Sequence, residues 1–467
     1  MARSITQRML GGPAVFAFAL AASGCGRSTP APAPQQAPSS SAPMASASRA
    51  SAVALPFIED DYPRALREAR RTGRAIFVDV WAPWCHTCLS LKQYVLTDPS
   101  LAPHAARFVW LSIDSERPEN AALVERLRIT ALPTLTIVEP SREAEAWTWR
   151  GALTAKELVG SLSMVQERLR NPGSQTDLEA AELAARSGRE GEALDAYKRA
   201  LVAATGEARG PVADAFVTLL DSQKRFADCA AVAAQVGPSL PEGTYRVDLA
   251  ITGAHCAIEA TAGKDKAGAA ARDAAAPFIR ELRLLSGGTS SAVLADDRSS
   301  AFEALVSTLR ATGDAEGAKA AAREWALMLE SAAGRAKTPA ERVVFDAHRL
   351  GAYIELGEPA RALPMLEASE RDFPDDYNPS ARRARALLEL GRLDDATKAA
   401  ERALERAYGP RRLRLFILKA DISKKRGDRT GEGASLDDAL ADAKRLSLRD
   451  SYRKLVESIE ARRKALP

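Results

Sequence analysis

A short apolar run followed at once by two cysteines constrains the fold of this chain more than any other feature. Residues 75–80 read Ala-Ile-Phe-Val-Asp-Val, and residues 81–88 read Trp-Ala-Pro-Trp-Cys-His-Thr-Cys. The apolar run predicts a buried strand. A helix that begins directly after it would hold Cys85 at its N-terminus and Cys88 one helical turn later.

This spacing of Cys85 and Cys88 predicts thiol–disulfide chemistry. Unpaired N–H groups and the dipole at a helix N-terminus stabilise a thiolate, and they lower a cysteine pKa from about 8.5 to roughly 3.5–7.5. We therefore predict that Cys85 attacks a disulfide and that Cys88 resolves the mixed disulfide. The alternatives are a fixed structural disulfide or half of a zinc site. Zinc needs four ligands, and the sequence has no second close pair of Cys or His residues. We expect no metal and no cofactor.

Strand and helix patterns alternate over residues 56–172. We expect strands at 75–80, 108–113, 135–138 and 146–149, and helices at 61–71, from the cysteine pair to 96, at 118–127 and at 154–170. Such alternation predicts an α/β domain with a mixed sheet that is covered on both faces.

Three segments in this region carry a resemblance to thioredoxin. They are 75–88, the stretch Arg-Ile-Thr-Ala-Leu-Pro-Thr at 128–134, and Trp-Arg-Gly at 149–151, and they occur in the family's order and spacing. The pair Asp98-Pro99 looks more like thioredoxin-like domains of the DsbD C-terminal type. The resemblance covers roughly 115 residues and implies an α/β thioredoxin fold.

The resemblance also assigns roles to several residues. Pro133 would be the cis-proline that faces the cysteine pair and presents a backbone edge to the substrate, and a cis X–Pro bond must be held by its context. Asp79 matches the family's buried acid, which helps to take the proton from the resolving thiol. The environment of the site would include four further residues: Trp84, the aromatic lip before the first cysteine, and His86, Thr87 and Thr134.

The chain departs from the thioredoxin pattern at three points. The middle pair is His86-Thr87, Trp110 aligns with the lysine that neighbours the buried acid, and Leu89 follows the second cysteine. A charged His86 would stabilise the Cys85 thiolate and make the pair more oxidising, while the alternative is that His86 only faces solvent. Loss of the lysine would make Asp79 harder to ionise. The other histidines are expected as surface or core residues rather than ligands, namely His104, His255 and His348.

Residues 176–467 are uniformly helical in pattern and contain a repeat. Gly357 and Gly391 each end a helix, stand 34 residues apart and are followed five residues later by alanine, and weaker copies begin at Gly188, Gly313 and Gly427. This period resembles tetratricopeptide repeats and predicts an all-α helical solenoid of about six to seven helix pairs, with 205–300 poorly matched. A single compact helical bundle is the alternative.

Two further cysteines, Cys229 and Cys256, fall in the helical region, 27 residues apart. In an exported protein they are most simply a structural disulfide, and two buried free thiols are the alternative.

The N-terminal segment, residues 1–25, has the pattern of an export signal. Two arginines precede an apolar run that is too short and too rich in Gly and Pro for a transmembrane helix. Its end, Leu-Ala-Ala-Ser-Gly-Cys, resembles a bacterial lipobox with Cys25 as the lipidated residue, and cleavage after Ala21 or Ala22 is the alternative. Acyl chains on Cys25 would anchor the protein. Gly26 in place of aspartate favours the outer over the inner membrane, so the folded part would face the periplasm.

The next segment, residues 26–55, is nearly all Ala, Pro, Ser, Gln and Thr, which predicts a disordered tether.

The overall charge of the chain gives no support for a nucleic-acid partner, because 65 basic and 61 acidic residues nearly cancel. The sequence thus predicts a membrane-anchored thiol–disulfide oxidoreductase whose partners are protein clients and a redox partner, with helical repeats as the binding surface. The alternatives are a scaffold lipoprotein in which the redox domain is secondary, and a chaperone or isomerase.

Overall fold

The computed structural model describes residues 54–170, 173, 176–261, 268–446, 448 and 452–466. The predicted signal peptide, Cys25 and the predicted tether up to residue 53 lie outside the described residues. Within the described ranges, no helix combines the length and the apolar character needed to cross a bilayer. We refer to residues 54–170 as the N-terminal domain and to residues 176–466 as the helical domain.

A five-stranded mixed sheet forms the centre of the N-terminal domain, with the strand order β1-β3-β2-β4-β5. The central strand β2 pairs in parallel with β3 and antiparallel with β4. The strands are β1 Phe57–Glu59, β2 Ile76–Trp81, β3 Val109–Asp114, β4 Thr134–Glu139 and β5 Ala144–Arg150. The predicted mixed sheet is confirmed, and β1 escapes prediction because three residues are too few for a periodic signal.

Helices cover both faces of this sheet, as predicted. They are α2 Tyr62–Thr72, α3 His86–Ser90, η2 Leu91–Val95, η3 Pro99–His104, η4 Pro118–Asn120, α4 Ala121–Arg126 and α5 Ala155–Arg170. Side chains alternate along β2, so that Ile76 and Val78 pack with α2 and α4, whereas Phe77 packs with η2 and α5. Asp79 points to the same face as Phe77, which is the face covered by the helix that follows Cys85.

The helical domain consists of consecutive antiparallel helices that pack in pairs, among them α6 with α7, α12 with α13, and α17 with α18. Its helices are α6 Asp177–Arg186, α7 Glu190–Ala203, η5 Gly206–Ala208, α8 Arg209–Ser222, α9 Phe226–Val236, η6 Gly237–Ser239, α10 Thr244–Ala260, α11 Ala269–Gly287, α12 Ala295–Ala311, α13 Ala315–Arg335, α14 Pro339–Val343, α15 Asp346–Leu356, η7 Pro359–Ala362, α16 Leu363–Asp372, α17 Tyr377–Glu389, α18 Leu393–Arg406, α19 Arg411–Arg426, α20 Arg429–Arg445 and α21 Arg453–Lys464. The predicted all-α repeat region is confirmed.

Left-handed glycines and buried alanines explain the repeat. The glycines singled out by the period all have positive φ, at 188, 313, 357, 391 and 427, which lets each helix end in a tight turn. The alanine five residues later is buried at Ala193, Ala318, Ala362 and Ala396, so the second helix can approach the first. Between α8 and α9 the same turn is made by Lys224, with φ 59°, and this is one reason why the glycine pattern fades over 205–300.

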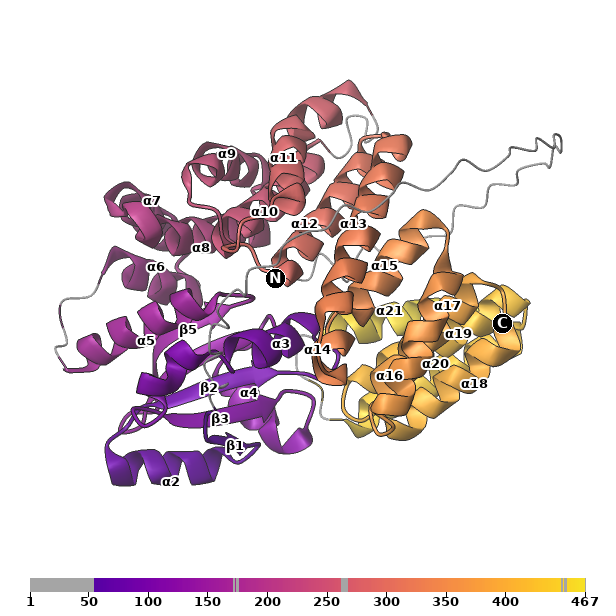
Figure 1. Cartoon of the computed structure of the whole chain (residues 1–467), viewed down its shortest axis with the longest axis horizontal. Helices are drawn as coiled ribbons and strands as arrows, with labels where there is room; N and C mark the ends of the chain where they lie inside the picture. Colours follow the sequence, from indigo (N-terminus) through magenta and orange to yellow (C-terminus); the bar gives the residue numbers. More distant parts are fainter. Residues whose placement is uncertain are drawn as a thin grey trace, which may run out of the picture.

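The helical domain arches around the N-terminal domain (Figure 1). Helices α6 to α9 lie to one side of it, α12 reaches the cysteine helix α3, and α16 to α21 lie on the other side. Contacts of α12 with α3 and of α14 with η2 join the two domains. In the part of the arch formed by α9 and α10, Cys229 and Cys256 are joined in a disulfide with Cα atoms 6.0 Å apart.

Close packing of α9, α10 and α11 predicts that Gly253→Ala destabilises the chain. A Cβ at this position would overlap the ring of Phe278 and come within 2.8 Å of the Ala233 Cβ, and overpacking of this kind costs about 1–3 kcal/mol. Gly160→Ala in α5 is the matched control, because no atom lies within 4 Å of its added Cβ and alanine favours a helix interior by roughly 0.5–1 kcal/mol. Thermal unfolding followed by circular dichroism should show a lower midpoint for the first variant and an equal or higher one for the second. A Gly253→Ala midpoint equal to that of the wild type would contradict the packing.

Candidate active site

Cys85 is the N-cap residue of α3 and is joined to Cys88 in a disulfide with Cα atoms 5.2 Å apart. The Cys88 backbone N–H donates a hydrogen bond to the Cys85 Sγ at 3.1 Å. Helix α3 continues without a break into η2. Cys88 is fully buried and Cys85 is only 5% exposed. The geometry therefore gives the Cys85 sulfur a backbone donor that would stabilise a thiolate after reduction.

Pro133 immediately precedes β4, in a cis peptide bond with Leu132. Leu132 packs against Cys85 and Cys88, so this bond borders the cysteine pair. The Pro133 carbonyl accepts a hydrogen bond from the Gly151 N–H at 2.8 Å. The neighbouring Thr134 is buried and donates its hydroxyl to the Ala131 carbonyl at 2.7 Å. Pro133 and Thr134 are thus held by bonds to Gly151 and Ala131, and Leu132 between Ala131 and Pro133 makes the contact with the cysteine cluster.

Asp79 is fully buried beneath the cysteine helix and forms an ion pair with Lys92, with Nζ and Oδ2 3.2 Å apart. Lys92 lies on η2 and also donates to the Ser112 hydroxyl at 2.7 Å. Burial raises the pKa of the Asp79 carboxyl, and Lys92 opposes this shift. The expectation that Asp79 lacks a lysine is therefore wrong: Lys92 reaches it from the helix rather than from the neighbouring strand.

The strand register separates Trp110 from Asp79. Asp79 lies opposite Ser112 on β3, whereas Trp110 lies opposite Phe77. Trp110 is buried, and its ring centroid lies 4.6 Å from that of Phe77. It is a core residue, two positions away from the neighbour of Asp79.

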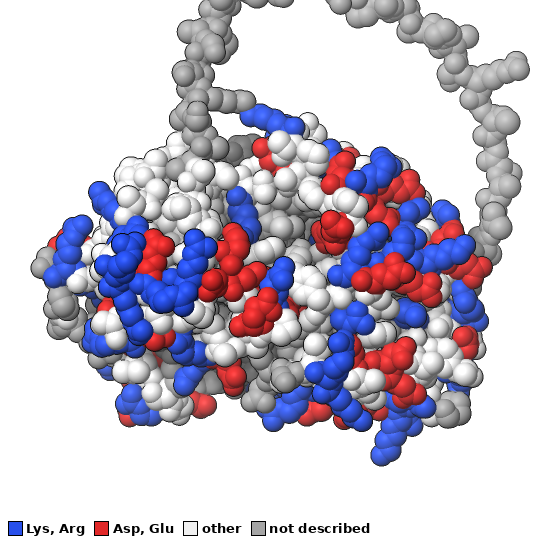
Figure 2. Space-filling model, turned by 90° about the horizontal axis from the view of Figure 1, so that it is seen from below, with Lys and Arg blue, Asp and Glu red and all other residues white. Residues whose placement is uncertain are grey.

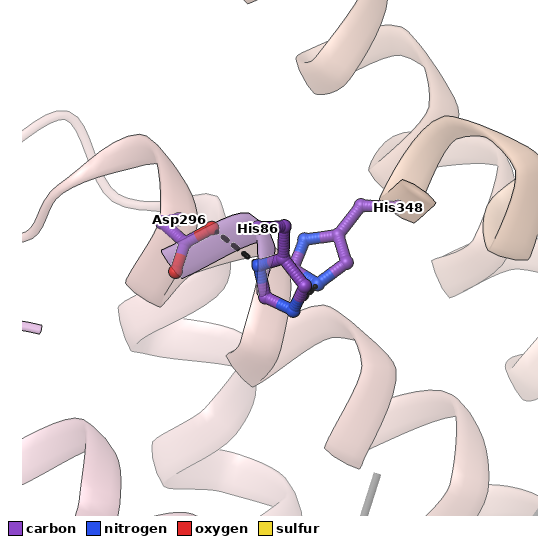
Figure 3. Close-up of side chains that lie close together, drawn as sticks. All are labelled: His86, Asp296 and His348. Atoms are coloured by element: carbon purple, nitrogen blue, oxygen red, sulfur yellow. Dashed lines mark hydrogen bonds and ion pairs between the residues drawn. The ribbon is translucent and has the colours of Figure 1, made fainter. Parts of the chain in front are cut away.

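His86 does not face solvent, contrary to one of the two expectations, because its ring bonds to two residues of the helical domain (Figure 3). Its Nδ1 lies 2.8 Å from Asp296 Oδ1, and its Nε2 lies 2.8 Å from His348 Nε2. Asp296 is in the first turn of α12 and is 5% exposed, and His348 on α15 is 7% exposed. The Thr87 hydroxyl lies 3.2 Å from His86 Nδ1.

Opposite pKa shifts follow from this arrangement. The pKa of His86 is raised, because Asp296 and the nearby Glu303 outweigh the effect of burial. Burial and the charge of His86 lower the pKa of His348 to about 3. The pKa of Asp296 is lowered, since His86 outweighs burial there too. These directions favour a positive charge on His86 over one on His348, beside the Asp296 carboxylate.

Trp84 forms a second contact between the domains. Its indole N–H donates to Glu116 Oε1 at 3.2 Å, and its ring packs in a cluster with Tyr377 and Tyr408. The guanidinium of Arg411 lies 4.9 Å from the centre of the indole ring. Contacts to the helical domain thus flank Cys85 on both sides, at Trp84 and at His86.

The loop after β3 is tied to the helical domain as well. Glu116 Oε2 accepts the Arg411 backbone N–H at 2.8 Å, and Glu116 Oε1 accepts the Tyr452 hydroxyl at 3.1 Å. The Tyr408 hydroxyl donates to Asp114. These bonds, together with those of His86, leave the cysteine pair beneath the inner surface of the helical domain.

Among the described residues, one group of side chains has ligand atoms close enough to hold a metal ion. The ligand atoms of His86, Asp296 and His348 all lie within 4.8 Å of one another. Sequence reasoning missed this group because its members are more than 50 residues apart. Lys92 was within reach of sequence reasoning, since it follows Cys88 by four positions and therefore lies on the same helix face. The other predicted histidines behave as expected: His104 is buried, and His255 is half-buried.

Charged side chains show no segregation by sign on the face drawn in Figure 2. Basic and acidic residues are interspersed there over both domains. This distribution agrees with the nearly balanced composition of 65 basic and 61 acidic residues, and it offers no basic surface on that face for a nucleic acid.

Comparisons with known proteins match each of the two domains. A family model described as thioredoxin-like matches residues 58–140, and a tetratricopeptide-repeat model matches residues 353–420. The chain therefore consists of a thioredoxin-like domain followed by tetratricopeptide repeats.

Similar proteins include two curated proteins and one solved structure. The chain is 31% identical over 78 residues to the thiol:disulfide interchange protein DsbD of Pseudoalteromonas atlantica, an alignment that covers 16% of this chain and 13% of that protein. It is 29% identical over 88 residues to protein disulfide-isomerase 1 of Dictyostelium discoideum, covering 19% and 24%. A thioredoxin from Thermus thermophilus is 29% identical, with 24% of this chain and 88% of that chain covered and a TM-score of 0.23. The matched region is a small part of both curated relatives.

The pH dependence of stability should reflect the shifted pKa values of His86 and His348. The pKa of His348 is about 3 in the folded chain and about 6.5 in an unfolded one. The unfolded chain therefore takes up this proton first, and stability falls as the pH falls below about 6.5, by up to about 1.4 kcal/mol per pH unit. The raised pKa of His86 acts in the other direction: its contribution is complete below about 6.5 and is lost as the pH rises through its folded value.

We expect His348→Gln to reduce the loss of stability that occurs as the pH falls below about 6.5. Glutamine offers an acceptor to His86 but does not titrate. Thermal unfolding midpoints measured between pH 4.5 and 7.5 should therefore fall less steeply toward acid in the variant than in the wild type. Parallel curves for the two proteins would show that His348 carries no such shift.

Proposed function

We propose that this chain, a thioredoxin-like domain joined to tetratricopeptide repeats, is a thiol–disulfide oxidoreductase that uses Cys85 and Cys88. The observation that carries the proposal is the Cys85–Cys88 disulfide at the start of α3, with the Cys88 N–H bonded to the Cys85 sulfur at 3.1 Å. A sulfur with a backbone donor is a good leaving group in the disulfide and a stabilised nucleophile in the dithiol.

The proposed reaction is an exchange of one disulfide for another. The Cys85 thiolate attacks a disulfide sulfur of the client, forms a mixed disulfide and releases the first client thiolate. Cys88 loses its proton and attacks Cys85, which re-forms the Cys85–Cys88 disulfide and releases the second client thiolate. The two electrons pass from the cysteine pair to the client, and a dithiol partner returns them. The reverse sequence oxidises a client dithiol.

Asp79 is proposed as the group that takes the proton from Cys88. It is buried on the face of the sheet that α3 and η2 cover, and its pKa is raised by burial. A carboxylate with a raised pKa is a stronger base than an exposed one. Lys92, 3.2 Å from Asp79, favours the carboxylate form, which is the form that accepts a proton.

Access to Cys85 requires that the two domains separate at Trp84 and His86. Cys85 is 5% exposed, and residues of the helical domain contact the side chain before it and the side chain after it. A polypeptide client that lies along the edge formed by Trp84 and Pro133 would have to displace the helical-domain contacts at Trp84. The proposed cycle therefore includes an opening step before the client binds.

A location in the cell envelope is part of the proposal. The lipobox-like end at Cys25 and the Pro-rich stretch after it would anchor the two domains to a membrane, with the outer membrane favoured, and leave them on a tether that faces the periplasm. Protein clients and a redox partner would meet the chain there. Metabolic labelling with a fatty acid in wild type and Cys25→Ala tests this anchor.

Cys88→Ala should trap the mixed disulfide. With the resolving thiol removed, Cys85 remains bound to its client, so non-reducing gels of cells that express the variant should show species that disappear on reduction. A Cys85→Ala, Cys88→Ala double variant is the control and should give none. Purified wild type should also speed the reduction of insulin by dithiothreitol. Absence of trapped species together with absence of insulin reduction would refute the proposed function and favour the scaffold alternative.

Gly409→Ala should accelerate the reaction with protein substrates if opening limits it. Gly409 has φ 61°, and a Cβ there would overlap the Glu116 carbonyl oxygen, so the variant weakens the contact beside Trp84. We expect a several-fold faster reduction of insulin, and a smaller effect on the small substrate oxidised glutathione. Gly427→Ala is the matched control: its φ is 79°, but no atom lies within 4 Å of its added Cβ. Equal rates for both variants and the wild type would show that opening does not limit the reaction.

A further inference from the structure

The helical domain supplies two side chains to the residue that follows the nucleophile. Asp296 and His348 are separated from His86 by 210 and 262 residues, and each lies 2.8 Å from a different nitrogen of its ring. The side chain of His86 is 23% exposed, and that of Asp296 is 5% exposed. No role in the exchange reaction requires this arrangement, so it calls for a separate explanation.

Hydrogen-bond chemistry limits the protonation states of the three groups. The Asp296 carboxylate can only accept, so the His86 Nδ1 carries a proton. The contact between the two Nε2 atoms needs one proton, on either His86 or His348. With that proton on His348 both rings are neutral, and with it on His86 the His86 ring is an imidazolium. The Asp296 carboxylate, 2.8 Å from the His86 ring and not in contact with His348 in this chain of bonds, favours the second arrangement. His86 then donates from both nitrogens, and His348 accepts as a neutral ring.

The other charged groups near the ring support the same assignment. Glu303 on α12 adds negative potential, and burial together with Glu355 and Asp296 raises its pKa to about 7. Arg382 on α17 acts in the opposite direction on both histidines. Arg382 is half-buried, and Asp296 is the charged group that bonds directly to His86. The position of Asp296 in the first turn of α12 further favours its carboxylate form, through the helix dipole.

We propose that Asp296 and His348 are positioning residues of the redox site, which hold His86 as an imidazolium beside Cys85 and thereby stabilise the reduced form of the cysteine pair. This inference rests on the proposed function. It makes the helical domain part of the redox site rather than only a binding surface. When the contact with α12 and α15 opens, His86 loses its carboxylate partner and the cysteine pair becomes more reducing.

The redox step balances as follows. Two electrons from a dithiol or from two thiols break the Cys85–Cys88 bond. Of the two protons that the donor thiols release, one goes to the Cys88 sulfur and the other to solvent. Cys85 remains a thiolate because the charge on His86 and the Cys88 N–H stabilise it. Stabilisation of this thiolate shifts the equilibrium toward the reduced form, which makes the pair a stronger oxidant.

A metal site is the competing explanation for the same three residues. Two imidazole nitrogens and one carboxylate oxygen are a ligand set for Zn²⁺. In this structure, however, both nitrogens of His86 are engaged, one with the carboxylate and one with the second ring. A bound metal would need to replace one of these bonds and remove the proton between the rings. The two explanations therefore exclude each other and can be tested together.

The test is the equilibrium of full-length wild type and Asp296→Asn with glutathione, read by thiol alkylation and mass spectrometry. We expect the variant to favour the disulfide by about tenfold, which corresponds to a potential about 30 mV more negative. The absorbance of the Cys85 thiolate near 240 nm should titrate at a higher pH. The sign is diagnostic, because loss of a negative charge alone would favour the thiolate and shift the equilibrium the other way.

Asp297→Asn is the matched control. Asp297 is also buried and lies on the same turn of α12, but it bonds to the Thr244 hydroxyl at 2.8 Å. Its variant should leave the equilibrium within twofold of the wild type or shift it slightly toward the thiolate. At His348, glutamine should retain most of the wild-type potential and leucine should not, because only glutamine offers an acceptor to the His86 Nε2–H. Circular dichroism establishes that each variant is folded.

Three results would overturn the inference. The first is an Asp296→Asn equilibrium within twofold of the wild type, and the second is an equal shift in Asp296→Asn and Asp297→Asn. The third is calorimetric binding of one Zn²⁺ per chain that His348→Leu abolishes, because this would assign the cluster to a metal. A wild-type protein that never equilibrates with glutathione would instead refute the proposed function. The two failures are therefore distinguishable.

Discussion

The bond between the His86 ring and two residues of the helical domain is the interaction on which the arrangement of this molecule depends. Buried polar groups destabilise a protein unless they are hydrogen-bonded, and an unpaired buried charge costs more than an unpaired neutral group. Asp296 therefore needs the His86 ring, and His348 needs the same ring from the other side. These two bonds hold α12 and α15 next to the cysteine helix.

A second contact, around Trp84, also holds the two domains together. Glu116 binds the indole N–H and the Arg411 backbone N–H, so a single carboxylate joins the tryptophan before Cys85 to the turn before α19. The inner surface of the arch is therefore occupied by the chain's own N-terminal domain (Figure 1). The prediction that the repeats form a binding surface therefore applies to their outer surface in the closed form, and to the inner surface only after the two domains separate.

The sequence was sufficient to predict those features that depend on neighbours along the chain. The apolar run before Cys85, the cysteine spacing and the segment that ends at Pro133 predicted the sheet, the helix start and the residues that border the pair. Glycines with positive φ, such as Gly357 and Gly391, predicted the helix ends, because the conformation of a turn is encoded locally.

The features that escaped prediction depend on tertiary distance. Lys92 was missed because the resemblance assigned the partner of Asp79 to a strand position, whereas the helix face that continues from Cys88 carries it. His348 and Asp296 were beyond reach, since no local pattern distinguishes a histidine in α15 from an ordinary core residue. Only the curvature of the helical domain, accumulated over many helices, brings these side chains to His86. This is why the sequence could predict the cysteine pair at the start of α3. It could not predict the helical-domain side chains that surround His86.

Thermodynamic linkage couples the redox state of the cysteine pair to the docking of the helical domain at His86. If the docked helical domain stabilises the Cys85 thiolate through His86, then the thiolate must stabilise docking by the same factor, because coupling free energies are reciprocal. A tenfold effect on one equilibrium is a tenfold effect on the other, or about 1.4 kcal/mol. The reduced chain is then the more tightly closed form and the oxidised chain opens more readily. On the proposed function, the form that opens is the one that accepts electrons, which favours a partner dithiol over a client disulfide as the first molecule to reach the cysteine pair.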